Sequence, residues 1–280
     1  MKNTFLYTLI LTLFLMGCEE EIANLRGNEP GHHNYIPVEF KTLVFGDEFE
    51  GDGLPDAQKW GFEIGFVRNS ELQYYTNGRL ENCYQKDGNL HIVARNDNAL
   101  IDGETRPFTS ASITTRAKAG WKYCRVEVRA KLPVARGTWP AIWMLPVSTA
   151  IYGGWPKSGE IDIMENVGYD ATKMHFTAHM EKYNYTKNNA KAATLTTTTP
   201  GDFHVYALEW QRDRLIWYFD GEPVHEYKTE LNSTWQSWPF NQHFYLIINL
   251  AFGGGWGGQQ GVDLSKLPLD YVIDYVRVYQ

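Results

Sequence analysis

Short runs of alternating or continuous apolar residues recur from Thr42 onward, and Gly, Pro or Asp-Gly pairs separate them. The clearest runs cover 89–94, 123–132, 203–210 and 244–251. Runs of this length are typical of β-strands, and the chain shows no long amphipathic helical pattern. The spacing therefore predicts a β-sandwich.

The last predicted strand, 271–279, has an acid among its apolar positions. Alternation places Asp274 on the same face as Val272, Val276 and Val278. We therefore expect Asp274 to be a buried acid that needs a partner.

A second strand pattern, in residues 160–165, carries three acids. Alternation sends Glu160 and Asp162 to one face, and an extra residue at Ile163 or Met164 in a β-bulge would return Glu165 to that face. Three carboxyls this close share protons, so one of them is available as an acid at neutral pH. The alternative is a cation site or a solvated edge strand.

These acids, together with the preceding residues 155–159, resemble the signature of glycoside hydrolase family 16 in its bulged, laminarinase-like form. The resemblance implies that Glu160 is the nucleophile, Glu165 the acid/base, and Asp162 the residue that tunes the nucleophile. A retaining glycosidase needs such a pair of one ionised and one protonated carboxyl. No cofactor is implied for this chemistry.

The resemblance extends from about Val44 to Gln280, beginning at the segment 45–49 and including the C-terminal strand. It implies an all-β jelly roll of two antiparallel sheets with the substrate cleft across the concave one. We expect residues 39–280 to form this single catalytic domain.

The resemblance also implies substrate-binding residues. Trp139 and Trp143 lie four apart in the segment 137–145 and would be sugar platforms, although either alone could belong to the core. Asn69 would hydrogen-bond substrate hydroxyls, whereas its neighbours Glu71 and Gln73 are expected to be structural.

Three further features of the family pattern concern the rim and the back of the fold. His179 would contact substrate or the acid/base, the alternative being a core histidine with its own partners. Trp256 is a candidate platform in a Gly-rich loop where Gly255 replaces a common Asn. Many members bind a structural Ca²⁺, for which the matching positions are Glu48, Gly88 and Asp274.

Residues 1–17 contain Lys2 and an apolar run shorter than the roughly 20 residues of a membrane span, which predicts a secretory signal. The run ends before Cys18 in a sequence that resembles a bacterial lipobox, and three Glu residues follow, as in surface lipoproteins of Bacteroidetes. We therefore expect an exported lipoprotein on the outer membrane and cell surface, lipidated at Cys18. The alternative is an ordinary cleaved signal. Residues 18–38 lack periodicity and predict a flexible tether.

Composition and net charge limit the classes of molecule that the protein is expected to bind. The chain has 280 residues, a formal net charge of −7 and 15% aromatic residues, with ten Trp. An acidic surface argues against nucleic acid or an anionic membrane as the main partner, which leaves the lipid anchor as the expected membrane contact. Abundant amphipathic rings suit sugar binding. Cys83 and Cys124 could form a disulfide, although separate buried thiols are favoured.

The sequence therefore predicts a monomeric, endo-acting, retaining β-glucanase for β-1,3 or β-1,4 linkages in laminarin or mixed-linkage glucan. One alternative is a hydrolase of agar or porphyran, although no Arg cluster suited to sulfate lies near the acids. The other is a surface glycan-binding protein without activity, a class that typically loses one or both catalytic Glu.

Overall fold

The computed structural model of the protein describes residues 39–280. The predicted signal peptide, Cys18 and the predicted tether lie outside the described residues. Between residues 39 and 280, no helix is long and apolar enough to cross a membrane. The regular secondary structure of these residues consists almost entirely of strands in two sheets, as the spacing of apolar runs predicts.

Ten strands form the larger sheet, in the order β15-β14-β13-β8-β17-β5-β6-β3, with β1 also beside β17 and β4 beside β5. β3 and β6 are parallel, and the other pairs are antiparallel. The strands are β1 Leu43–Asp47, β3 Tyr74–Tyr75, β4 Cys83–Lys86, β5 Asn89–Ile101, β6 Glu104–Ser110, β8 Cys124–Lys131, β13 Phe203–Trp210, β14 Arg214–Phe219, β15 Glu222–Lys228 and β17 Leu269–Tyr279.

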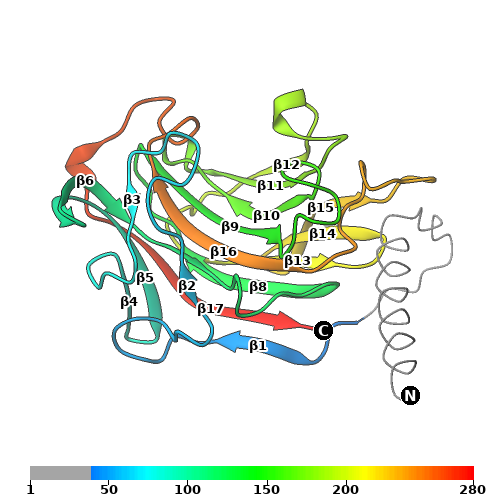
Figure 1. Cartoon of the computed structure of the whole chain (residues 1–280), viewed down its shortest axis with the longest axis horizontal. Helices are drawn as coiled ribbons and strands as arrows, with labels where there is room; N and C mark the ends of the chain where they lie inside the picture. Colours follow the sequence, from blue (N-terminus) through cyan, green and yellow to red (C-terminus); the bar gives the residue numbers. More distant parts are fainter. Residues whose placement is uncertain (1–38) are drawn as a thin grey trace, which may run out of the picture.

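Seven antiparallel strands form the smaller sheet, in the order β12-β11-β10-β9-β16-β7-β2. Figure 1 shows this sheet bent, with its concave face turned away from the larger sheet; we call this the outer face. The strands are β2 Gly61–Phe62, β7 Ser112–Thr114, β9 Thr138–Pro146, β10 Glu160–Glu165, β11 Lys173–His179, β12 Lys191–Thr196 and β16 Phe244–Phe252, and the 3₁₀ turns are η1 Gly168–Asp170, η2 Tyr185–Lys187 and η3 Leu264–Lys266.

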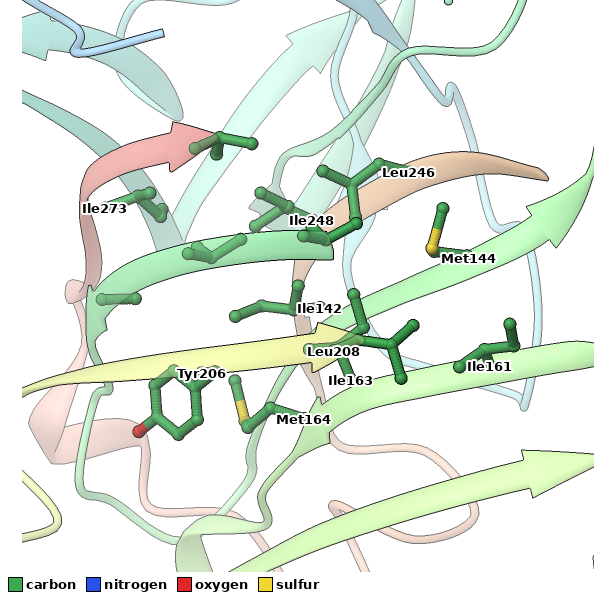
Figure 2. Close-up of a cluster of buried hydrophobic side chains, with 14 of the residues drawn as sticks. Ile142, Met144, Ile161, Ile163, Met164, Tyr206, Leu208, Leu246, Ile248 and Ile273 are labelled. Atoms are coloured by element: carbon green, nitrogen blue, oxygen red, sulfur yellow. The ribbon is translucent and has the colours of Figure 1, made fainter. Parts of the chain in front are cut away.

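The core lies between the two sheets. In β8, burial alternates along the strand, so its apolar positions face inward as period-two patterning requires. Strands of both sheets contribute to one cluster of fully buried side chains, shown in Figure 2: Ile142, Met144, Ile161, Ile163, Met164, Tyr206, Leu208, Leu246, Ile248 and Ile273. The inner face of β10 is thereby anchored, which leaves its acids on the outer face.

The last strand differs from its prediction. The register of β17 against β8 shifts between Ile273 and Tyr275, so the buried positions change from odd to even numbers along the strand. Asp274 lies at this irregularity, half-buried, and its carboxylate pairs with Arg129. The prediction of a buried Asp274 was wrong because one extra residue reverses the alternation.

The two described cysteines are separate. Cys83 and Cys124 are both free and fully buried, and burial raises the pKa of each thiol. The preference for unpaired thiols is confirmed.

Candidate active site

The three acids lie together on the outer face because β10 contains a bulge. Asp162 pairs with Trp143 of β9 and Glu165 pairs with Ala141, while the register shifts between them on both neighbouring strands. Ile163 and Met164 are both fully buried in the core. The extra residue thus returns Glu165 to the face of Glu160 and Asp162, which confirms the predicted wall. We call these three residues the acid row.

The bulge has a partner in the opposite sheet. The indole nitrogen of Trp217, a fully buried residue of β14, donates to the backbone carbonyl of Asp162 at 2.8 Å. A bulge disrupts the ladder and leaves backbone groups in need of partners. Trp217 therefore supports the backbone that aims the acid row.

Burial sets the protonation of the acid row. It raises the pKa of Glu160 and of Asp162 well above their usual ranges, and the charge of Asp162 adds to the effect on Glu160. Burial also raises the pKa of Glu165, although the indole N–H of Trp139, 3.0 Å from Glu165 Oε1, opposes this. The row can therefore hold a proton near neutral pH, which supplies a donor beside an ionised carboxylate.

His179 faces the acid row instead of the core. Its Nε2 lies 3.2 Å from Asp162 Oδ2 and 4.0 Å from Glu160 Oε1. One ligand atom from each of these three residues lies within 4.8 Å of the other two, so the group could also hold a metal ion. His179 thus lies beside the acids, next to Asp162 and Glu160. Its predicted contact with substrate or with the acid/base Glu165 stays a prediction.

Two of the predicted platforms lie at the Glu165 end of the row. Trp139 is half-buried and packs edge-on against Trp256, with ring centroids 5.5 Å apart. Trp256 also contacts His175, the cross-strand partner of Glu165, at 4.9 Å. This arrangement leaves part of both indoles at the surface beside the acid/base position.

Trp143 has a different environment. It is 7% exposed, and the guanidinium carbon of Arg68 lies 4.7 Å from its ring centroid. A cation over the ring face leaves little free surface for a sugar. The structure therefore places Trp143 on the outer face but does not leave it as an open platform.

A chain of hydrogen bonds links Trp143 to a buried acid. Trp143 Nε1 donates to Asn249 Oδ1 at 2.7 Å, Asn249 Nδ2 donates to the Tyr75 hydroxyl at 3.0 Å, and Tyr75 donates to Glu71 Oε2 at 3.3 Å. Burial raises the pKa of Glu71, opposed mainly by a hydrogen bond from Gln73. We call Glu71, Tyr75, Asn249 and Trp143 the Glu71 network.

Asn69 joins the Glu71 network to the Gly-rich loop. It is exposed, its side chain donates to Glu71 Oε1 at 3.3 Å, and its carbonyl accepts from Gly255 N at 2.9 Å. Glu71 and Gln73 are structural, as predicted. The roles of Tyr75 and Asn249 were missed from the sequence, because only the folded chain brings these residues to Glu71.

Two exposed aromatic residues beside His179 were also missed. Trp155 lies in the loop before β10 and Tyr185 begins η2. Their rings lie 5.2 Å apart, and each ring lies within 6.2 Å of the His179 ring. Tyr185 belongs to a segment without strand periodicity, so no pattern could connect it with the acids.

The implied calcium site does not fit the side chains as they stand. Glu48 forms two 2.8 Å hydrogen bonds with Arg277, and Asp274 pairs with Arg129. Gly88 lies in the turn between β4 and β5 at a φ of 74° and offers backbone only. Both carboxylates are thus already neutralised by guanidinium groups, and no step of the chemistry below uses calcium.

The sequence profile of glycosyl hydrolases family 16 matches residues 70–277, which include the whole acid row. The chain belongs to glycosyl hydrolase family 16. A β-glucanase of Rhodothermus marinus is 42% identical over 289 residues, covering 100% of this chain and 96% of that protein. This membership makes the acid row the active site of a glycoside hydrolase and confirms the jelly-roll fold.

Solved structures agree with this membership. The laminarinase of Rhodothermus marinus has a TM-score of 0.81 at 45% identity, covering 85% of this family 16 hydrolase and 97% of that chain. A mutant of SCLam, a non-specific endo-β-1,3(4)-glucanase, was co-crystallized with an oligosaccharide. Its structure has a TM-score of 0.82 at 41% identity, covering 91% of this chain and 99% of that chain.

Proposed function

We propose that this family 16 hydrolase is an endo-acting, retaining β-glucanase that cleaves β-1,3 or β-1,4 bonds in laminarin or mixed-linkage glucan. The observation that carries the proposal is the acid row itself, with both Glu residues and the intervening Asp on one face of a bulged strand. The similar proteins named as β-glucanase, laminarinase and endo-β-1,3(4)-glucanase support glucan over galactan as the substrate.

In the first step, the ionised carboxylate of Glu160 attacks the anomeric carbon while Glu165 donates its proton to the leaving glycosidic oxygen. The products are a glycosyl ester on Glu160 and a free sugar chain. The charge of His179 lowers the pKa of Glu160, which favours the ionised nucleophile in a buried setting.

In the second step, Glu165 is a carboxylate and takes a proton from water. The water oxygen attacks the anomeric carbon, and the Glu160 carboxylate leaves. Two inversions give net retention. The indole N–H of Trp139 donates to Glu165 Oε1 and orients this carboxyl group.

The test is incubation of the purified protein with laminarin, barley mixed-linkage glucan, lichenan and agarose, with Glu160→Gln as control and chromatography of the products. Oligosaccharides from a glucan, absent with the variant, would support the proposal, and their sizes would identify the linkage cut. Activity on agarose alone would transfer the protein to the galactanases, and binding without hydrolysis would exclude an enzyme.

We also propose that the protein is exported as a monomeric lipoprotein anchored through Cys18, a proposal supported by the sequence of residues 1–18. Radiolabelled palmitate should be incorporated by the wild type and not by Cys18→Ala. Light scattering of the solubilised protein should give one chain per particle. Equal labelling of both proteins would exclude the anchor at Cys18.

A further inference from the structure

Three rings form a closed set of contacts around Glu165. The indole N–H of Trp139 donates to Glu165 Oε1 at 3.0 Å, and the Trp139 ring packs edge-on against Trp256 with ring centroids 5.5 Å apart. The Trp256 ring packs edge-on against His175 in turn, with 4.9 Å between the centroids. His175 is the cross-strand partner of Glu165, which closes the set. We call Trp139, Trp256 and His175 the Glu165 ring cluster.

The orientation of Trp139 depends on its neighbours in this cluster. Trp139 is half-buried, so the core alone does not enclose its indole. Trp256 packs against it from the loop that follows β16, and no strand holds Trp256 in place. The ring of Trp256 therefore needs support on its other side, and His175 supplies that support.

His175 is itself held in a regular strand. It belongs to β11 and shares a hydrogen bond with its partner in β12, with 3.2 Å between His175 Nδ1 and Thr194 Oγ1. Burial lowers the pKa of His175, an effect that the charge of Asp170 opposes and that of Lys173 increases. The imidazole is therefore predominantly neutral at pH 7 and meets Trp256 as an aromatic ring.

His175 has no direct polar contact with Glu165. The charged groups that interact with Glu165 are Glu160 and Asp162 of β10 and His179 of β11. Among residues 39–280, no side-chain hydrogen bond or ion pair joins His175 to Glu165. Any influence of His175 on the carboxyl group therefore passes through the two intervening indoles.

We propose that His175 is a positioning residue for acid catalysis: it holds Trp256 against Trp139 and thereby keeps the Trp139 indole N–H on Glu165. The inference rests on the proposed function, in which Glu165 protonates the leaving oxygen. An edge-to-face ring contact is strong enough to change the population of a bonded arrangement by up to about tenfold. Loss of the His175 ring should therefore weaken proton donation without removing any group of the acid row.

The test compares phenyl and 2,4-dinitrophenyl β-laminaribioside as substrates. Phenoxide is a poor leaving group that needs the proton of Glu165, whereas 2,4-dinitrophenolate leaves without it. The two aglycones have similar shapes, so a lost contact with the aglycone would slow both substrates. His175→Ala should lower kcat/KM about tenfold for the phenyl glycoside and less than about twofold for the dinitrophenyl glycoside.

The pH profile gives a second readout. Burial raises the pKa of Glu165, and the hydrogen bond from Trp139 opposes this. When that bond is weakened in His175→Ala, the pKa of Glu165 should rise, so the carboxyl group stays protonated to higher pH. The basic limb of kcat/KM for the phenyl glycoside should then move to higher pH. A general loss of structure would lower the profile without moving this limb.

Two variants are controls. His175→Phe keeps a ring beside Trp256 and loses the hydrogen bond to Thr194, so it should restore the wild-type ratio of the two kcat/KM values. His91→Ala removes a histidine ring from the larger sheet, where it stacks on Tyr84 with centroids 4.7 Å apart. It should leave both kcat/KM values unchanged.

Trp256→Ala removes the same contact from the loop side, which keeps the test decisive if His175→Ala fails to fold. It should show the selective loss, and the double variant should lose no more than Trp256→Ala alone. Equal losses for the two substrates, an unmoved basic limb, or His175→Phe as impaired as His175→Ala would overturn the inference. A wild type that cuts neither glycoside nor any glucan would instead contradict the proposed function, so the two failures are distinguishable.

Discussion

The indole of Trp217 and the backbone carbonyl of Asp162 are joined by a 2.8 Å hydrogen bond that crosses from one sheet to the other. Asp162 is the last residue before the register shift that brings Glu165 into the acid row. The larger sheet, which carries no residue of the acid row, thus fixes the local backbone on which the distance between nucleophile and acid depends.

Trp217→Phe should therefore impair both folding and catalysis. It leaves the carbonyl of Asp162 without its partner and opens a small cavity, which should lower the free energy of unfolding by at least about 2 kcal/mol. Because the backbone of the bulge would shift, Glu160 and Glu165 would lose their alignment, which should also reduce kcat. Urea unfolding and initial rates on laminarin measure the two effects.

Trp210→Phe is the matched control. Trp210 is fully buried, and its indole donates to the carbonyl of Phe240 at 3.0 Å, away from the bulge. The Trp210→Phe variant should lose a comparable free energy of unfolding. At temperatures well below its unfolding temperature, its kcat should equal that of the wild type. An equal loss of kcat in both variants would show that Trp217 acts through general stability only.

Stability should depend on pH through Glu160. Its pKa in the folded state is raised above the ordinary value of 4.5, so the folded protein binds more protons than the unfolded chain between those two pKa values. The free energy of unfolding therefore falls as the pH rises from 4.5 through the folded pKa.

The substitution Glu160→Gln removes the contribution of Glu160 to the pH dependence of the free energy of unfolding. At pH 8 the variant should be more stable than wild type, by about 1.4 kcal/mol for each pH unit of the pKa difference, and the gap should close toward pH 4. Thermal unfolding of both proteins across this range measures it. A gap that is constant with pH would assign the effect to packing instead of charge.

His179 should influence the acid side of the rate profile. Its charge lowers the pKa of Glu160, opposing the burial that raises it. In His179→Phe the pKa of Glu160 should rise further, so the acidic limb of kcat/KM should move to higher pH. The loss of a charge-assisted contact should also reduce kcat by roughly 10- to 100-fold. An unmoved acidic limb would mean that His179 does not interact with the ionised nucleophile.

The Glu71 network should affect substrate binding more than chemistry. Tyr75→Phe leaves Asn249 Nδ2 without its acceptor and frees the amide that orients Trp143. We expect a loss of about 1–3 kcal/mol in the free energy of unfolding and a rise in KM that exceeds any fall in kcat.

Tyr271→Phe removes a buried hydroxyl that has no hydrogen-bond partner among residues 39–280, and it serves as the control. Its KM should stay at the wild-type value. A fall in kcat at constant KM in Tyr75→Phe would place the network in the chemical step and contradict its assignment to binding.

Residues 160–165 show why much of the acid row could be predicted. Alternation fixes the faces of Glu160 and Asp162, and Glu165 could only rejoin them through one extra residue. The same reasoning failed at Asp274, because nothing in the apolar pattern of 271–279 indicates the irregularity found there. Local periodicity predicts on which face of a strand a side chain lies. It indicates a bulge only where a functional residue, such as Glu165, would otherwise lie on the wrong face.

Contacts between distant segments were not predictable. Three such contacts are the guanidinium of Arg68 over the Trp143 ring, the hydrogen bond between Tyr75 and Asn249, and the ring contact between Tyr185 and His179. The first two join residues that are far apart in the sequence. In the third, Tyr185 lies outside any regular pattern. These contacts depend on loop conformation, which the spacing of apolar residues does not encode.

The central claim is that Glu160 is the nucleophile of a retaining mechanism, and trapping of the covalent intermediate tests it most directly. The protein should be incubated with 2-deoxy-2-fluoro-β-laminaribiosyl fluoride, which forms the glycosyl ester but hydrolyses slowly, and then digested and mapped by mass spectrometry. The account predicts one sugar adduct, on Glu160. An adduct on Asp162 or Glu165, or none while the same protein cleaves glucan with inversion, would contradict it.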